Sequence, residues 1–147
     1  LTTRVQQYLD KILKTKYTIV INKTYGFTIL DKNNSQVTGE GYKVVVSFAF
    51  IAGIIDLLNE QVISFTMPES FPLVMDAPFA KLDDHNRISI NRMLPSIARQ
   101  LILFTTDSQW TGAVENELKE KIGKKYEMKN HFENDVENGL TRVIEVK

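Results

Sequence analysis

Residues 71 to 83 constrain the fold of this chain more than any other segment, because they read FPLVMDAPFAKLD. This order predicts an apolar strand over Leu73 to Asp76, then a turn at Pro78, then the pair Leu82-Asp83. A buried strand that ends in Asp delivers a carboxylate to the carboxyl edge of a sheet, where α/β proteins bind their ligands. A core strand capped by a turn-forming Asp would read the same way, so the segment needs support from its neighbours.

Two neighbouring segments provide that support. Upstream, Val37 to Gly41 reads VTGEG and opens an apolar stretch from Val44 to Leu58. The apolar residues of this stretch recur at helical spacing, which predicts one helix of about four turns. Downstream, residues 100 to 107 read QLILFTTD, a second strand that ends in a polar cluster.

A helix predicted over Asn86 to Leu94, ending near Pro95, separates the two strands. Strand, helix and strand in this order form a βαβ unit, whose strands are parallel by strong preference. The strands that end at Asp76 and at Thr106-Asp107 should therefore finish at the same edge of one sheet.

Together these segments resemble the second half of an ABC-type ATPase head of the SMC and SbcC kind, over about residues 35 to 110. In that family the order is signature motif, Walker B strand, D-loop and switch strand. Here they would be Gly39-Glu40, Leu73 to Asp76, Leu82-Asp83 and Thr105 to Asp107. The Asp-Ala-Pro-Phe form of the Walker B ending and the Thr-Asp ending of the switch strand are most similar to the DndD-type ATPases of DNA phosphorothioation systems.

The resemblance implies the α/β fold class and, within it, the C-terminal lobe of an ABC/SMC-type P-loop ATPase head. Such a lobe has a mostly parallel sheet with flanking helices and peripheral β-hairpins. Residues 1 to 15 would form a helical stub, either the end of a coiled-coil arm or an ordinary surface helix. Residues 16 to 147 would then form the ATPase lobe. Because the chain begins with Leu1, we expect it to be a piece of a longer protein.

Two β-hairpins are predicted outside the βαβ unit. Tyr17 to Ile21 and Gly26 to Leu30 are rich in β-forming residues and are separated by turn residues. Near the end of the chain, Tyr126 to Met128 and Thr141 to Val146 predict a closing hairpin with its turn at Glu137 to Gly139.

The resemblance also implies roles for particular residues. Asp76 would hold the Mg²⁺ of bound ATP, through water. Thr38, Gly39 and Glu40 would bind the phosphate of an ATP molecule held by the opposite head, at the amino end of a helix. Asp83 would lie in the D-loop, which crosses the dimer interface. A common helix entry at Thr38 to Gly41, and a simple helix cap at Asp83, are the alternatives that the residues leave open.

The chain departs from the family pattern at two positions. Val37 stands where the signature motif has a serine, so one phosphate donor is missing unless Thr38 or Ser35 replaces it. Ala77 stands where the family has the glutamate that orients the attacking water, and alanine cannot do this. Losing such an acid costs a factor of about 10² to 10⁴ in rate. Asp107 is the candidate to position water in its place.

No Gly-x-x-x-x-Gly-Lys-Ser/Thr sequence is present, so the loop that wraps the β- and γ-phosphates is not in this chain. The resemblance therefore implies a partner lobe with Walker A, an amino-terminal part of the same protein. A second head would form a homodimer around two ATP molecules. Hydrolysis would release the heads and move attached arms or DNA, in DNA metabolism, DNA repair or antiphage defence linked to DNA modification. A clamp that binds nucleotide with little or no hydrolysis is one alternative. An α/β interaction module that binds no nucleotide, in which the Walker-like strand is a coincidence, is the other.

Composition limits the remaining possibilities. Lys plus Arg number 18 and Asp plus Glu number 18, so no overall positive field attracts the chain to DNA, and DNA contact would be indirect. No cysteine is present, which excludes a disulfide framework and fits a cytoplasmic location. His85 and His131 lack the partners of a zinc site. No apolar run is expected to reach the roughly 20 residues of a membrane helix, because Ser47, Gly53 and Asp56 interrupt the longest one.

Overall fold

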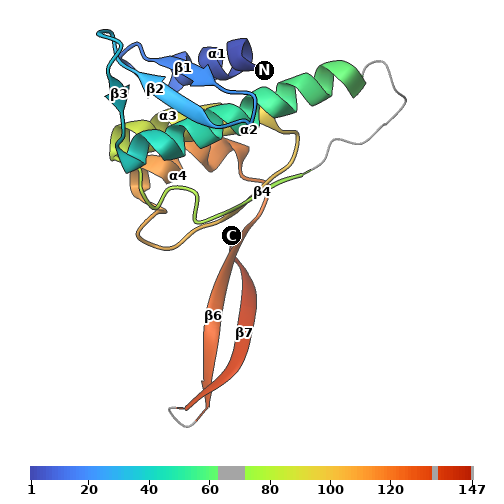
Figure 1. The fold of residues 1–147 in the computed structure, drawn as a ribbon. Coiled ribbons are helices and arrows are strands. Elements are labelled where there is room, and N and C mark those ends of the chain that lie inside the picture. The colour runs from blue at the N-terminus through green and yellow to red at the C-terminus, as the bar shows by residue number, and fades with distance from the viewer. Residues whose placement is uncertain (63–71, 134–135, 147) are drawn as a thin grey trace. The chain divides into compact units, whose positions relative to one another are not determined.

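The computed structural model describes residues 1–62, 72–133 and 136–146. These residues divide into two compact units, unit 1 (Leu1–Glu117) and unit 2 (Leu118–Lys147). Figure 1 labels most of the elements. Along the chain they are α1 (Thr2–Ile12), β1 (Thr18–Ile21), β2 (Phe27–Leu30), β3 (Gln36–Val37), α2 (Glu40–Val62), β4 (Leu73–Asp76), α3 (Asp84–Ile97), β5 (Leu101–Phe104), α4 (Gly112–Leu118), the short 3-10 helix η1 (Lys119–Lys121), β6 (Lys125–Glu133) and β7 (Val136–Val146).

Helix α1 belongs to the core of unit 1. Its residues Val5, Leu9 and Ile12 recur at helical spacing and are almost completely buried against the rest of the unit. Burying one such side chain contributes about 1.5–3 kcal/mol. The first segment is therefore an integral part of compact unit 1, which extends to Glu117. The predicted division at residue 15, between a helical stub and an ATPase lobe, stays a prediction.

The first predicted hairpin is confirmed and gains a third short strand. β1 pairs antiparallel with β2, with Thr18 opposite Leu30, and β2 pairs antiparallel with β3. In the turn between β1 and β2, the Asn22 side chain accepts hydrogen bonds from the backbone N–H groups of Thr24 and Gly26, at 3.0 and 2.8 Å. Ile19 and Ile29 point from this sheet into the core.

Helix α2 is longer than predicted, at 23 residues, because it begins at Glu40 and continues to Val62. A Cβ atom on Gly53 would lie 3.0 Å from Val5 Cγ2, so the glycine lets α1 approach closely. Residues Glu40–Glu60 are long and apolar enough to cross a membrane by length and composition alone, with a mean hydropathy of 1.8. The expectation that no run reaches that length is therefore wrong. A helix in the core of a folded unit can have the same apolar composition. Here α1 and α3 pack against α2, as expected for such a core helix.

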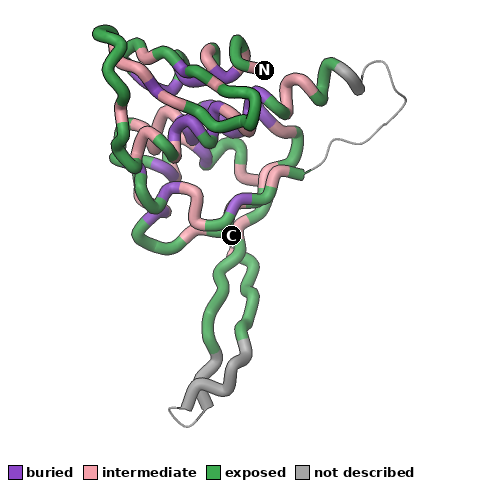
Figure 2. The backbone as a smooth tube through the Cα atoms, in the orientation of Figure 1, coloured by how far each residue is buried: buried purple, intermediate pink, exposed green. Residues whose placement is uncertain are grey.

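The predicted βαβ unit is present, and β4 and β5 are parallel, with Asp76 opposite Phe104. Helix α3 connects them and continues two residues beyond Pro95 to Ile97. Phe79, in the turn after β4, is fully buried and stacks on Phe48 of α2, with ring centroids 6.5 Å apart. This contact fixes the turn against α2, as does the burial of neighbouring Leu82. Figure 2 shows the buried residues gathered where the helices of unit 1 pack together.

The expected mostly parallel sheet does not appear among the described strands. β4 and β5 form the one parallel pair there, while β1–β2–β3 and β6–β7 are antiparallel sheets. The difference follows from the connections: only β4 and β5 are joined through a helix, whereas tight connections join the other pairs and allow antiparallel pairing alone.

Unit 2 is dominated by the hairpin of β6 and β7, as predicted, but the turn predicted at Glu137 to Gly139 is wrong. Phe132 pairs with Glu137 and His131 pairs with Leu140, which places Asn138 and Gly139 inside β7. The register shifts at this point, as in a β-bulge, where one strand carries extra residues. Asn and Gly favour bulges as well as turns, so the sequence alone did not distinguish the two.

Candidate functional site

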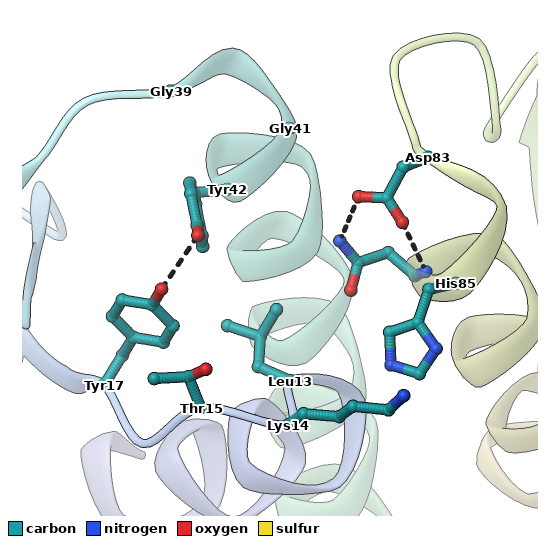
Figure 3. A pocket seen from close by; sticks show the side chains of 10 residues that line it. Leu13, Lys14, Thr15, Tyr17, Gly39, Gly41, Tyr42, Asp83 and His85 are labelled. Atoms are coloured by element: carbon teal, nitrogen blue, oxygen red, sulfur yellow. Dashed lines mark hydrogen bonds between the residues drawn. The ribbon is translucent and has the colours of Figure 1, made fainter.

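A cleft of about 300 Å³ in unit 1 brings together segments that are far apart in the sequence. The end of α1 and the following loop form one side, and the amino ends of α2 and α3 form the others (Figure 3). The residues that line the cleft are Leu13, Lys14, Thr15, Tyr17, Gly39, Gly41, Tyr42, Asp83, His85 and Asn86. The candidate signature motif and the candidate D-loop therefore meet at one place.

Two tyrosines hold the glycine-rich entry of α2. The hydroxyl groups of Tyr17 and Tyr42 are 2.8 Å apart and share a hydrogen bond, and the two rings meet edge to face. The carbonyl of Gly39 accepts a backbone hydrogen bond from Tyr42, at 3.1 Å. A Cβ atom on Gly39 would lie 3.1 Å from the Tyr42 ring, so a larger residue would displace that ring.

The Tyr17 segment is in turn fixed to α1. Gln6 donates a hydrogen bond to the carbonyl of Tyr17 at 2.8 Å and accepts one from the backbone N–H of Ile19 at 2.9 Å. The hydrogen bond with Tyr42 and partial burial raise the pKa of Tyr17. Helix α1 is thus connected to the entry of α2 through a continuous set of hydrogen bonds.

Asp83 caps helix α3. Its carboxylate accepts a hydrogen bond from the backbone N–H of Asn86 at 2.9 Å and another from the Asn86 side chain at 2.7 Å. The helix-cap alternative is therefore present in the structure, and Asp83 lines the cleft at the same time. The next residue, Asp84, pairs with Arg87 at 3.6 Å.

Glu40 links the entry of α2 to the turn after β4. Its carboxylate pairs with Lys43 at 2.6 Å, in the same helix turn, and with Lys81 at 3.5 Å. The hydrogen bond from Lys43, followed by the contribution of Lys81, lowers the pKa of Glu40. Thr38 is exposed and, like Glu40, lies next to the cleft lining without being part of it.

The other two predicted residues lie elsewhere, at the carboxyl ends of β4 and β5. Asp76 ends β4 and is exposed, and Asp107 is exposed in the turn that follows β5. Neither side chain makes a hydrogen bond or ion pair within residues 1–62, 72–133 and 136–146. Neither lines the cleft. The predicted site residues therefore form two groups, one at the cleft and one at this edge of the sheet.

The turns at this edge are connected to each other. The N–H of Ala77 donates to the carbonyl of Phe104 at 2.9 Å, and Ala77 has a φ of 45°, a left-handed conformation that residues with a Cβ rarely adopt. The N–H of Phe79 donates to the buried side chain of Gln109 at 3.4 Å. The backbone after the Walker B-like strand is thus held by the segment after the switch-like strand.

One face of the β4–β5 sheet is covered and the other is exposed. Leu73, Leu101 and Leu103 pack against the core together with buried Met75. The opposite face presents apolar side chains with substantial exposed fractions: Val74 at 55%, Ile102 at 38% and Phe104 at 40%. Parallel sheets are usually covered on both faces, so this exposed face is unusual for a sheet of this kind.

No group of three or more His, Cys, Asp or Glu side chains that could hold a metal ion occurs among the described residues. Mg²⁺ does not need such a group beside a nucleotide, because it commonly takes one or two carboxylates with phosphate oxygens and waters. An exposed carboxylate at a strand end, as at Asp76, fits that mode.

Sequence reasoning missed most of the polar and aromatic residues that line the cleft. These are Lys14, Thr15, Tyr17, Tyr42 and His85. His85 was considered only as a zinc ligand, and the other four carried no motif. Their positions next to the end of α1 and the start of α2 were the available signal, but only the packing of α1 on α2 brings them together.

A chain of known structure matches this architecture. It comes from work on the structural biochemistry of ATP-driven dimerization and DNA-stimulated activation of SMC ATPases. The match covers 99% of this chain and 85% of that chain, with a TM-score of 0.61 and 13% sequence identity. This chain has the fold of an SMC ATPase.

At 13% identity, the likeness to the SMC ATPase chain establishes the fold alone. No protein-family model matches this chain. A search of curated proteins found no match either. The SMC ATPase fold agrees with the resemblance inferred from the order of motifs, and it extends over nearly the whole chain.

Proposed function

We propose that this chain is the C-terminal lobe of an SMC-like ATPase head that binds ATP and Mg²⁺ and dimerises around the nucleotide. The observation that carries the proposal is the SMC ATPase fold over 99% of the chain, with the motif order of such a head along it. DNA metabolism is the proposed setting, and a DndD-type role in DNA phosphorothioation and defence is the finer form of the proposal. Contact with DNA would be made through the full protein, since this chain carries no net charge.

The exposed face of the β4–β5 sheet supports the proposal that an amino-terminal lobe completes the head. Val74, Ile102 and Phe104 present an apolar surface that water would otherwise contact. A lobe that carries Walker A would cover this surface, and its strands would extend the two parallel strands into the mostly parallel sheet of a complete head. The first helix, α1, would be the end of a coiled-coil arm.

The group of acids at the sheet edge is the proposed catalytic part. Asp76 would hold Mg²⁺ through water, and the ion would neutralise charge on the transferred phosphate. Asp107 would position the attacking water, a task that Ala77 cannot perform. Because Asp107 follows a different strand from the usual acid, slow turnover is expected.

The cleft is the proposed contact with the second head. Thr38, Gly39 and Glu40 lie at the amino end of a 23-residue helix, where free N–H groups favour a phosphate. Asp83 would lie at the same interface through the D-loop. Two heads would then enclose two ATP molecules as a homodimer.

ATP hydrolysis by this chain co-expressed with the amino-terminal lobe tests the proposal. Asp76→Asn should reduce turnover at least about 100-fold, because it removes the metal-binding charge. Asp10→Asn is the matched control, since Asp10 is an exposed carboxylate on α1, and its turnover should equal that of the wild type. Equal turnover in the Asp76 variant and the wild type would refute a catalytic role for this edge.

A clamp that binds ATP with little or no hydrolysis is the second candidate, and Val37 and Ala77 favour it. In that case ATP should produce dimers in size-exclusion chromatography without measurable turnover. Ala77→Glu, which restores the family's acid, should then raise turnover by at least about tenfold while dimerisation is unchanged. If no variant forms dimers with ATP and none hydrolyses ATP, both candidates are refuted.

A further inference from the structure

The cleft contains two basic side chains that none of the motifs assigns. Lys14 follows α1, and His85 lies in the first turn of α3. Figure 3 shows the amino group of Lys14 pointing toward the imidazole of His85 along one wall of the cleft. We propose that Lys14 and His85 bind a phosphate group in this cleft. The inference deepens the proposed function and rests on it for the source of that phosphate.

The charges in the cleft favour an anion. Asp83 is the one acid among the described residues that line it, and each of its carboxylate oxygens accepts a hydrogen bond from Asn86. Lys14 and His85 make no hydrogen bond or ion pair within the part of the chain that the structure describes. Two basic side chains thus line the cleft against one acid, and neither of them forms an ion pair with the Asp83 carboxylate in the described part of the chain. A phosphate between them would accept hydrogen bonds from both.

The remaining lining suits the atoms attached to such a phosphate. Thr15 adds a hydroxyl donor, and the rings of Tyr17 and Tyr42 and the side chain of Leu13 provide apolar surface. The volume of about 300 Å³ is at the lower end of small-ligand sites, enough for a phosphate and part of a nucleoside.

The site would also account for Val37. A signature serine would normally donate a hydroxyl to the phosphate at this edge, and valine has no donor. Lys14 and His85 approach the same helix entry from α1 and α3, so this chain would bind the phosphate with different residues. The phosphate could belong to ATP on the opposite head or to the DNA backbone, and the experiment separates these sources.

Binding is measured on the 147-residue chain by ¹H–¹³C NMR of the histidine side chains. The chain has two histidines, and His85→Gln assigns the signals of His85, leaving His131 as an internal reference. Sodium tripolyphosphate is the first probe because it presents phosphate alone. We expect a saturable shift of the His85 signals and none of the His131 signals. No shift of His85 at millimolar probe would overturn the proposal.

Matched variants test the assignment to Lys14. Lys14→Gln should weaken tripolyphosphate binding about tenfold, the usual effect of losing a charged hydrogen bond. Lys16→Gln removes an equal charge from an exposed residue outside the cleft and should leave binding unchanged. Equal effects of the two variants would reduce the interaction to non-specific charge attraction and overturn the proposal. Circular dichroism verifies that both variants are folded.

Two further probes identify the source of the phosphate. A His85 response to ATP with Mg²⁺ supports the nucleotide, and a response to a short DNA duplex but not to ATP supports the DNA backbone. Asp76→Asn should bind tripolyphosphate like the wild type, because Asp76 lies outside the cleft. If the ATPase proposal fails while His85 still responds, the phosphate site stands without it. If the head hydrolyses ATP but no probe shifts His85, the phosphate site fails alone.

Discussion

The cleft and the carboxyl edge of β4–β5 differ in how far this chain completes them. At the cleft, hydrogen bonds within unit 1 join the parts, from Tyr17 to Tyr42 and from Asn86 to Asp83. At the sheet edge, Asp76 and Asp107 make no such contacts in the described residues, and one face of the sheet is exposed. This chain therefore holds the cleft together by its own hydrogen bonds, whereas under the proposed function the sheet edge would be completed by the proposed amino-terminal lobe.

The turn between these two regions should be the most sensitive to substitution. Phe79→Ala should lower the free energy of unfolding by about 3–5 kcal/mol, because Phe79 is fully buried against Phe48. Phe104→Ala, on the exposed face, should lower it by less than about 1.5 kcal/mol. Urea denaturation of the chain measures both. Similar losses of stability in the two variants would mean that the exposed face is packed within this chain. The difference between the two regions would then be contradicted.

The sheet face should matter for association more than for stability. Val74→Lys should change the free energy of unfolding by less than about 1 kcal/mol. It should weaken binding to the proposed amino-terminal lobe about 100-fold, because an unpaired charge would be buried there. Val20→Lys is the matched control, a strand valine of similar exposure (48%) in the β1–β2–β3 sheet. Calorimetric titration gives the affinities. Unchanged binding by Val74→Lys would mean that this face is not part of the interface.

Substitutions of the two tyrosines test whether the hydrogen bond between Tyr17 and Tyr42 helps unit 1 to hold the cleft together. Tyr42→Phe and Tyr17→Phe should each lower the free energy of unfolding by about 1 kcal/mol, and the double variant by less than the sum. Because the pKa of Tyr17 is raised above 10, this contribution should be present below pH 10 and lost as the pH rises beyond it. Tyr25→Phe, at an exposed position, is the control. Additive losses in the double variant would show that the hydroxyl groups do not interact.

The smallest effect is expected at Glu40, whose ion pairs are exposed. The pKa of Glu40 is lowered by Lys43 and then Lys81, so its contribution is present above the ordinary pKa of 4.5 and is lost as the pH falls below it. Glu40→Gln should therefore lower the urea midpoint slightly at pH 7 and not at pH 3. A difference that persists at pH 3 would attribute the effect to packing and not to charge.

Much of the fold followed from patterns along the chain. Apolar spacing predicted α1, α2 and α3, and the strand order predicted the parallel βαβ unit whose first strand ends at Asp76. The patterns failed where two structures share one local sequence. Asn138-Gly139 suits a turn and a bulge alike. Gly53 interrupts the apolar run of the sequence, yet in α2 it allows Val5 to pack closely.

The order of motifs, the absence of Walker A and the substitutions at Val37 and Ala77 were determined by the sequence, because each depends only on residue type and spacing. The tertiary structure alone decided that α1 belongs to the core and that Lys14, Tyr17, Tyr42 and His85 surround one cleft. These residues come from three segments separated along the chain, and no local pattern relates them. Only the packing of α1 on α2, and of α3 beside them, brings their side chains together.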